Sequence, residues 1–223
     1  MNSESSAIAT EGLSKAFGAR KALDKVSFEL PRGASLAIFG HNGAGKTTLL
    51  RVLATLLRPS GGVVRVLGLD LKEEPEKIRA RIGMVSHRSM LYLDLTAEEN
   101  LLTTARLYGV SDAAARVAEL LAAVELTARS HDVVRGFSRG MTQRLAIARA
   151  LICDPELLFL DEPYTGLDPH AIDILDGLLS SLLASSYMTR TLVMVSHDVD
   201  RGRQFATHVL TLDKGRIASF GEV

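Results

Sequence analysis

The chain has 223 residues, and its 26 Lys and Arg residues balance 26 Asp and Glu residues, so the formal net charge at pH 7 is zero. That balance argues against a nucleic-acid-binding protein, which normally carries a basic excess, and a hydrophobic content of 47% excludes a disordered chain. The longest segments without a charged residue, 33–45 and 177–189, are shorter than the ~20 apolar residues of a membrane-spanning helix. One cysteine, Cys153, excludes an internal disulfide, and Met1–Ser6 lacks the basic and apolar regions of a secretory signal. These features predict a globular cytosolic protein.

Two kinds of strand are expected along the chain. Alternation of apolar and polar residues at 26–30 and 63–66 predicts half-exposed antiparallel strands. Uniformly apolar segments are typical of buried parallel strands, and three occur, at 34–39, 157–160 and 191–195. Each of the three ends at a polar or glycine-bearing turn, which is where α/β sheets place ligands.

Between these strands the sequence has helix signals. Thr96 to Glu99 forms a capping box, Ser111-Asp112 caps a second helix expected through Leu126, and a third is expected from Met141 to about Cys153. Residues 209–218, with Asp213-Lys214-Gly215 at the centre, predict a closing hairpin. The chain is therefore expected to be an α/β core interrupted by a helical insertion.

A glycine-rich segment lies directly between the apolar strand at 34–39 and a helical run at 48–57. It fits the pattern G-x-x-x-x-G-K-[ST] and reads Gly40-His41-Asn42-Gly43-Ala44-Gly45-Lys46-Thr47, followed by Thr48. Glycines let backbone N–H groups turn inward onto phosphate oxygens, and the helix N-terminus adds positive potential. Lys46 is placed to reach the β- and γ-phosphates, and the Thr47 hydroxyl to ligate Mg²⁺. We expect these nine residues to bind a nucleotide; an ordinary glycine turn is the alternative.

Two adjacent acids, Asp161 and Glu162, follow the apolar strand at 157–160. Carboxylates at the end of a buried strand are costly unless a cation or hydrogen-bond donors compensate them. Asp161 is expected to bind the Mg²⁺ shell, and Glu162 to polarise a hydrolytic water. A solvated turn is the alternative for this pair.

The segment from Phe137 to Leu151 carries the most specific pattern in the chain. It resembles the signature of ABC-transporter ATPase subunits, usually written L-S-G-G-Q and followed by a helix rich in Gln and Arg. Phe137, Arg139 and Met141 depart from that pattern, whereas Ser138 and Gly140 retain it. Ser138 is expected to cap a helix whose N–H groups point at an anion. The resemblance implies that Ser138 and Gly140 bind the γ-phosphate held by the opposite subunit of a dimer.

Further segments resemble other elements of this family, and the resemblance extends from about residue 8 to 221. Asp168, in a loop that reads Tyr-Thr-Gly-Leu-Asp-Pro, resembles the acid of the loop joining two subunits. His197 resembles the histidine that contacts the γ-phosphate and the attacking water, so with Glu162 it is the implied catalytic pair. Phe17 occupies the place of the adenine-stacking aromatic, with core packing as its alternative. His87 stands where the family usually has Gln; because imidazole is a poor Mg²⁺ ligand, its implied role is coupling to a membrane partner, with a water-mediated Mg²⁺ contact open.

The resemblance implies an α/β P-loop NTPase (RecA-like) core with an antiparallel β subdomain and an inserted helical subdomain. The expected ATPase domain is 7–223, with the core at about 7–83 and 154–223 and the helical subdomain at about 84–153. The implied function is hydrolysis of ATP with Mg²⁺ by a homodimer or heterodimer of ATPase subunits. That hydrolysis would drive separate integral membrane permease subunits through 84–100, with no nucleic acid as partner. The implied location is the cytoplasmic face of the cell membrane.

Two other classes of protein are the alternatives to this implied function. A soluble ABC-type ATPase usually needs two cassettes, a long coiled coil or a basic surface, and a P-loop kinase or GTPase does not account for Phe137–Leu151. No N-K-x-D guanine motif is present. The signature variant at 138–141 and the segment 85–92 resemble exporter-type ATPases. The haem-exporter ATPase of cytochrome c maturation is the first expectation for cargo, with drug or polysaccharide exporters as alternatives.

Overall fold

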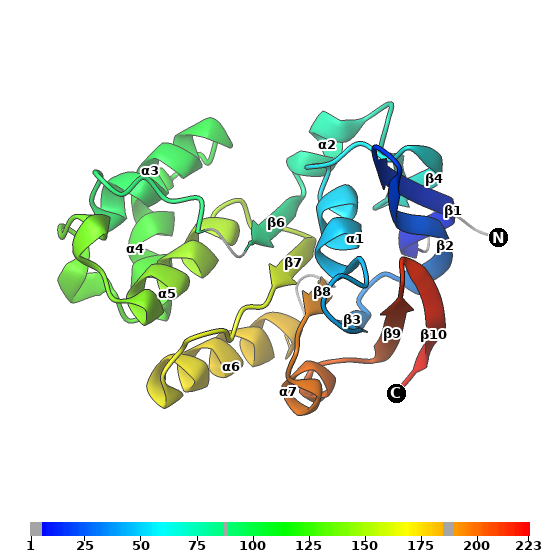
Figure 1. Cartoon of the computed structure of the whole chain (residues 1–223). Coiled ribbons are helices and arrows are strands. Elements are labelled where there is room, and N and C mark those ends of the chain that lie inside the picture. Colours follow the sequence, from blue (N-terminus) through cyan, green and yellow to red (C-terminus); the bar gives the residue numbers. More distant parts are fainter. Residues whose placement is uncertain (1–5, 87–88, 185–189) are drawn as a thin grey trace.

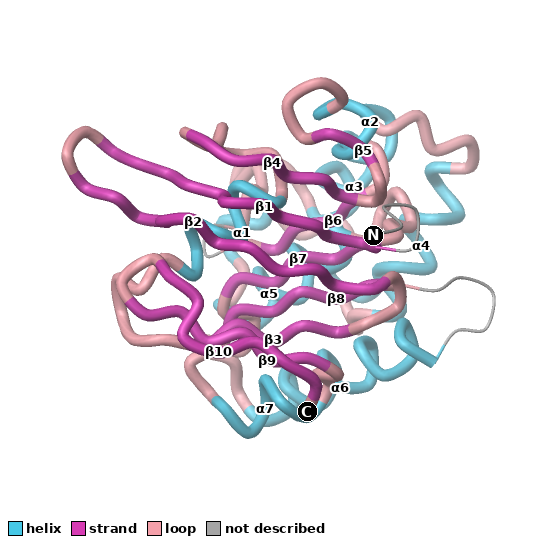
Figure 2. Tube along the Cα trace, turned by 90° about the vertical axis from the view of Figure 1, so that its right-hand side faces the viewer, coloured by secondary structure: helices cyan, strands magenta, loops and turns pink. Residues whose placement is uncertain are grey.

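The computed structural model describes residues 6–86, 89–184 and 190–223. Within them the chain forms two β-sheets (Figures 1 and 2). The antiparallel sheet has the order β2-β1-β4-β5 and consists of β1 (Ser6–Phe17), β2 (Arg20–Pro31), β4 (Gly61–Val66) and β5 (Leu69–Asp70). The expected strands at 26–30 and 63–66 are thus confirmed as antiparallel.

The second sheet carries the strands that position the site, in the order β10-β9-β3-β8-β7-β6. Its strands are β3 (Ser35–Phe39), β6 (Ile82–Val85), β7 (Leu157–Asp161), β8 (Thr191–Val195), β9 (His208–Asp213) and β10 (Arg216–Glu222). All neighbours are parallel except the β9–β10 hairpin. Every residue of β3, β7 and β8 is buried, which confirms the expectation from their uniform hydrophobicity. Because β3, β8 and β7 are adjacent and parallel, the loops that follow them meet at one sheet edge.

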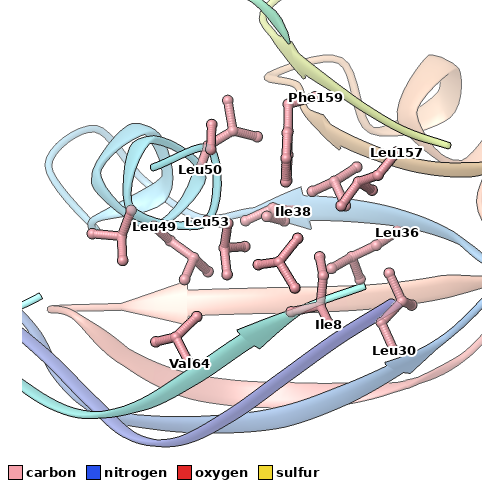
Figure 3. Packing of buried hydrophobic residues seen from close by; sticks show 14 of the residues in the cluster. Ile8, Leu30, Leu36, Ile38, Leu49, Leu50, Leu53, Val64, Leu157 and Phe159 are labelled. Atoms are coloured by element: carbon pink, nitrogen blue, oxygen red, sulfur yellow. The ribbon is translucent and has the colours of Figure 1, made fainter. Parts of the chain in front are cut away.

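The main core lies between the two sheets and around α1 (Lys46–Leu53). Figure 3 shows Leu50 and Leu53 of α1 beside Ile38 of β3, with Ile8 and Val64 approaching from the antiparallel sheet. These five side chains are at most 3% exposed. Burial of these side chains from β1, β3 and β4 against α1 fixes the position of α1, and with it the end of the glycine-rich segment.

The middle of the chain forms a helical part that lies on the opposite side from β1 and β4 in Figure 1. Its helices are α3 (Ala97–Leu107), α4 (Ala113–Ala123) and α5 (Arg139–Ala150), with short 3₁₀ turns at Thr127–Arg129 and Val134–Gly136. The capping box at Thr96 forms as expected, with Thr96 accepting from the Glu99 N–H and Glu99 from the Thr96 N–H. These helices share a second apolar core with β6, β7 and β8.

The described residues also form α2 (Pro75–Arg79), α6 (Pro169–Ala184) and α7 (Val199–Gln204). None of the helices in the described ranges has the length and apolarity needed to cross a bilayer.

Candidate active site

The glycine-rich segment forms a loop between β3 and α1 in which three glycines adopt positive φ. A Cβ on Gly40 (φ +144°) would lie 2.3 Å from the Leu212 carbonyl oxygen, and one on Gly45 (φ +109°) would lie 2.6 Å from the Ala22 carbonyl oxygen. A side chain at either position would therefore collide with neighbouring backbone as well as strain its own. The loop packs against β9 on one side and β2 on the other.

Lys46 is the first residue of α1, and its side chain is folded into this loop with the residue only 6% exposed. Its Nζ donates to the Gly40 carbonyl at 2.6 Å and to the His41 carbonyl at 3.2 Å. An ammonium group has three donors, so the loop carbonyls hold the cation at the helix N-terminus, where an anion is favoured.

Thr47 and Asp161 meet although they are far apart in sequence. The Thr47 hydroxyl donates to Asp161 Oδ1 at 3.1 Å, and Asp161 is 2% exposed at the end of β7. A hydroxyl and a carboxylate are hard oxygen ligands, the kind that Mg²⁺ prefers together with water and phosphate oxygens. These two side chains therefore fit the ion that the sequence predicts here.

Glu162 lies beside His197 from the end of β8. Glu162 Oε1 is 3.1 Å from His197 Nε2, and Oε2 accepts the His197 backbone N–H at 3.1 Å. Glu162 adopts φ +55°, a left-handed conformation that is strained for a non-glycine residue. Burial raises the pKa of the Glu162 carboxyl group, opposed by the His197 N–H and the nearby His197 and Lys46 charges. A carboxylate with a raised pKa, oriented by two contacts, is suited to take up a proton.

Lys46, Thr47, Glu162 and His197 line one cavity of about 370 Å³, and Asp161 lies beside it through its contact with Thr47. Its walls come from the β1–β2 hairpin, the glycine-rich loop and the ends of β7 and β8. The lining residues are Phe17, Arg20, Ala22, Asn42, Gly43, Ala44, Gly45, Lys46, Thr47, Thr48, Glu162 and His197. The N–H groups of the loop, the Lys46 ammonium and the polar lining side chains make this cavity suited to a phosphorylated ligand.

Phe17 is at this cavity and is 51% exposed, with Lys15 Nζ 5.0 Å from the ring centroid. Its exposure argues against the alternative of core packing, and an exposed ring face can stack on a base.

His41 is in the loop, but its ring does not line the cavity. It points instead to Asp213 at the end of β9, with Nε2 3.0 Å from Asp213 Oδ1. Gly40 is likewise absent from the lining, and its carbonyl faces Lys46.

The signature segment folds as expected at its start. The Ser138 hydroxyl accepts from the Met141 N–H at 3.2 Å and caps α5. Neither Ser138 nor Gly140 lines the 370 Å³ cavity of the same chain. Their neighbours Phe137 and Arg139 line a second cavity of about 250 Å³ that reaches Asp161 and Glu162.

Asp168 caps α6, since its Oδ1 accepts from the Ala171 N–H at 2.9 Å. Gly140 leaves room beside it, because a Cβ there would lie 3.5 Å from Asp168 Oδ2. The loop containing Asp168 therefore packs against the start of α5. His87, the expected coupling residue, lies outside the described residues.

Arg20 and Ala22 also line the cavity, and sequence reasoning did not identify them. A Cβ on Gly43 would lie 3.6 Å from Arg20 Nη2, so the guanidinium reaches the glycine-rich loop. No sequence pattern pointed to Arg20, which comes to the cavity because it pairs with Phe17 across β1 and β2.

Comparison with known proteins identifies the family. The ABC transporter family model matches residues 23–165, which is more than half of the chain. The chain belongs to the ABC transporter family. Its fold is that of the ATPase domain of this family: an α/β P-loop NTPase core with an antiparallel β subdomain and a helical part, as the sequence predicted.

Individual members of the ABC transporter family resemble the chain over most of its length. It is 38% identical over 217 residues to the daunorubicin/doxorubicin resistance ATP-binding protein of Streptomyces peucetius, covering 96% of this chain and 65% of that protein. It is 37% identical to the bacitracin transport ATP-binding protein of Bacillus licheniformis, covering 96% and 69%. An ATP-binding cassette solved as a dimer in a post-hydrolysis state with ADP and Pi matches with a TM-score of 0.87 at 27% identity, over 96% of this chain and 98% of that chain. The chain thus spans about two thirds of the length of these two relatives.

Proposed function

We propose that this chain hydrolyses Mg-ATP as one subunit of an ATPase dimer and thereby powers export through separate membrane subunits. The observation that supports this most directly is the convergence of Lys46, Thr47, Asp161, Glu162 and His197 at one sheet edge around one cavity or beside it. Five groups from three separate segments, each of the type that phosphoryl transfer requires, meet there.

The residues divide the chemistry as follows. The loop N–H groups from Gly43 to Thr48 and the Lys46 ammonium bind the phosphates and offset their charge. Thr47 and Asp161 hold Mg²⁺, which when bound neutralises charge on the phosphate oxygens. Phe17 stacks on the base.

Glu162 acts on the water that attacks the γ-phosphorus. Its carboxylate accepts a proton from that water, while His197, 3.1 Å away, orients the carboxylate and contacts the γ-phosphate. Burial of Glu162 favours this step, since a carboxylate with a raised pKa is the better base near neutral pH.

The position of the signature supports a shared site. Ser138 caps α5 and Gly140 lies beside Asp168, yet neither lines the cavity that holds Lys46 in the same chain. We propose that the α5 N-terminus completes the phosphate site of a second copy or a related ATPase subunit, and that Asp168 lies near the contact between them. The dimeric ATP-binding cassette that this chain matches favours that arrangement.

The membrane partner is proposed to dock at a groove of about 110 Å³ beside β6 and α5. Leu56, Met90 and Tyr108 line it and are all roughly half exposed. Arg149 at the same groove donates to the Met84 carbonyl at 3.0 Å, and burial lowers the pKa of its guanidinium. The occupant that fits is an apolar segment carrying a carboxylate, which would offset the cost of the desolvated cation.

The loop beside this groove is anchored to α3. Tyr92, which is exposed, donates its N–H to Asn100 Oδ1 at 2.8 Å, and Asn100 Nδ2 donates to the Tyr92 carbonyl at 3.0 Å and the Thr96 carbonyl at 2.9 Å. Asn100 itself is buried. This segment, 84–100, is the region through which coupling is proposed, with His87 as part of it.

The names of the relatives bear on the cargo. They state daunorubicin and doxorubicin resistance and bacitracin transport, which favours a drug or antibiotic exporter for this chain. Haem, the cargo expected first, stays a prediction that rests on the resemblance of 138–141 and 85–92 to exporter-type ATPases. The proposed location is the cytoplasmic face of the membrane, where ATP and the permease subunits meet.

Steady-state ATP hydrolysis by the purified chain, alone and with the membrane subunit that co-purifies with it, tests this function. We expect Mg²⁺-dependent turnover that rises when the membrane subunit is present. Turnover without any co-purifying membrane protein and without response to membranes would favour the soluble ABC-type ATPase instead. Absence of ATP binding would refute both.

A further inference from the structure

The side chain of His41 is turned out of the cavity and is held between two oxygen acceptors. Its Nε2 lies 3.0 Å from Asp213 Oδ1, and its Nδ1 lies 2.7 Å from the Asn42 carbonyl oxygen. Carboxylate and carbonyl oxygens only accept hydrogen bonds, so both ring nitrogens must donate for both contacts to form. Only the imidazolium form carries a proton on each nitrogen. The observed geometry is therefore fully satisfied only when His41 is charged.

The turn that follows Asp213 also contacts the glycine-rich loop through a backbone hydrogen bond. The Gly215 N–H donates to the Ala44 carbonyl at 2.9 Å, while the Gly215 carbonyl accepts from the Asp24 N–H of β2 at 2.8 Å. The Ala44 N–H in turn donates to the His41 carbonyl at 3.1 Å. The β9–β10 turn thus holds both ends of the tight turn from His41 to Ala44.

This tight turn determines where the Lys46 ammonium rests, because the His41 carbonyl is one of the two acceptors that hold it. A shift of the His41 backbone would move that acceptor and the amides that follow it. The charged groups that face His41 are Asp213 from β9, paired with its ring, and Lys46 from α1, which contacts its carbonyl. Both ring and carboxylate are a little over half exposed, at 55% and 58%.

We propose that His41 and Asp213 are positioning residues for ATP. Their ion pair, the clasp, joins the glycine-rich loop to the β9–β10 turn. This proposal rests on the proposed ATP-binding function. Protonation of His41 tightens the clasp, and loss of the proton removes one of its two hydrogen bonds. Neither residue touches the nucleotide; they act through the backbone of residues 41–44 and the carbonyl beside Lys46.

A double-mutant cycle tests the clasp, using His41→Asn, Asp213→Asn and the two together. The measured quantity is the dissociation constant of a fluorescent ATP analogue with Mg²⁺, at about pH 6, where imidazoles are mostly charged, and at about pH 8.5, where they are neutral. Exposed ion pairs couple weakly, so we expect a coupling factor of about two- to five-fold at the lower pH. At the higher pH the charge is lost and at most one hydrogen bond to Asp213 remains, so the factor should be smaller. The titration of the analogue's own phosphates affects all four proteins alike and cancels in the cycle.

The His131–Glu98 pair supplies a matched control, since its Nδ1–Oε2 distance is also 3.0 Å and it lies in the helical part. Its cycle, His131→Asn with Glu98→Gln, should give no coupling at either pH. His41→Gln is a second variant that keeps one donor toward Asp213 without titrating. It should match the wild-type affinity at the higher pH and lack the gain at the lower pH.

The possible results separate the clasp from the function on which it rests. No coupling at the lower pH overturns the clasp, and equal coupling at both pH values overturns the role of the imidazolium. A wild-type chain that binds no ATP analogue overturns the proposed function and the clasp with it. If Asp213→Asn melts at a lower temperature and does not stay folded, the pH response of His41→Gln decides the question, because that protein retains the carboxylate.

Discussion

The substitution Glu162→Gln removes the proposed proton acceptor but keeps the hydrogen bonds around it. An amide oxygen can accept the His197 N–H that Oε2 now accepts at 3.1 Å, and an amide NH₂ can donate to a neutral His197 Nε2 in place of the 3.1 Å contact of Oε1. Both contacts are thus reproduced, so stability should change by no more than about 0.5 kcal/mol. Only the basicity is lost. General-base catalysis contributes ~10²–10⁴-fold, so hydrolysis should slow by that factor, or ~2.7–5.4 kcal/mol in the barrier.

Single-turnover hydrolysis of radiolabelled ATP measures this barrier without product release. ATP affinity should stay at its wild-type value, because Lys46 and the loop amides are unchanged, and sedimentation velocity with Mg-ATP should show a dimer that wild-type protein loses as it hydrolyses. Glu119→Gln, an exposed carboxylate on α4, is the matched control and should hydrolyse at the wild-type rate. A Glu162→Gln rate within ten-fold of wild type, ~1.4 kcal/mol, would refute the assignment of Glu162 as the base.

Three further outcomes follow from the site. Lys46→Met should weaken ATP binding by ~10–100-fold, measured by equilibrium titration, because the buried ammonium is lost from the phosphate loop; unchanged affinity would mean that the loop is only a turn. Arg20→Met should weaken ATP binding by about ten-fold and leave adenosine binding unchanged, since its guanidinium reaches the loop at Gly43; an equal loss for both ligands would contradict a phosphate contact. Burial raises the pKa of Glu162, so the base form should be lost as pH falls through a value above the ~4.3 of a free glutamate, and the acid limb of the single-turnover rate should lie there. An acid limb at or below the pKa of a free glutamate would contradict a raised pKa of Glu162.

Much of the fold could be predicted because its signals are local. Uniform hydrophobicity identified β3, β7 and β8, and the capping box at Thr96 marked the start of α3. Helix ends were less accurate. The helix expected over 48–57 is α1 at Lys46–Leu53, and it stops where Thr55 adopts φ +62°. A threonine gives no signal for a left-handed conformation, which is disfavoured for a β-branched residue. Here it belongs to a C-terminal capping turn, in which the Leu56 N–H donates to the Arg51 carbonyl at 2.8 Å.

Two further helices begin or end at residues other than those expected, because local backbone conformation and capping set the boundary. The helix expected from Ser111-Asp112 through Leu126 is α4 at Ala113–Ala123, followed by Glu125 at φ +53°. The helix expected from Met141 begins two residues earlier, since capping by Ser138 draws Arg139 and Gly140 into the first turn of α5.

The site residues were likewise predictable where the sequence signal is local and not where distant segments meet. Gly40 to Thr48 is contiguous, so its spacing alone indicates a phosphate loop, and the acids at 161 and 162 are adjacent at a strand end. His41 was expected to bind nucleotide because it lies inside the loop motif, but its ring pairs with Asp213, 172 residues away. Arg20 reaches the cavity only because β1 and β2 fold into a hairpin over the loop. No local pattern encodes contacts between such distant segments; they follow from the order of strands in the sheets.

The anchoring of Tyr92 to Asn100 has a mechanical consequence. Two hydrogen bonds, of 2.8 and 3.0 Å, join Tyr92 of the loop to Asn100 of α3, so a force on Tyr92 is passed to that helix. Leu101 and Ala105 of α3 are packed in the same apolar core as Leu145 of α5. Under the proposed function, a displacement applied at Tyr92 therefore travels as a rigid-body rotation of α3 and α5 together. Under the same proposal, the helical part would carry that displacement from the membrane partner to the capped end of α5 at Ser138.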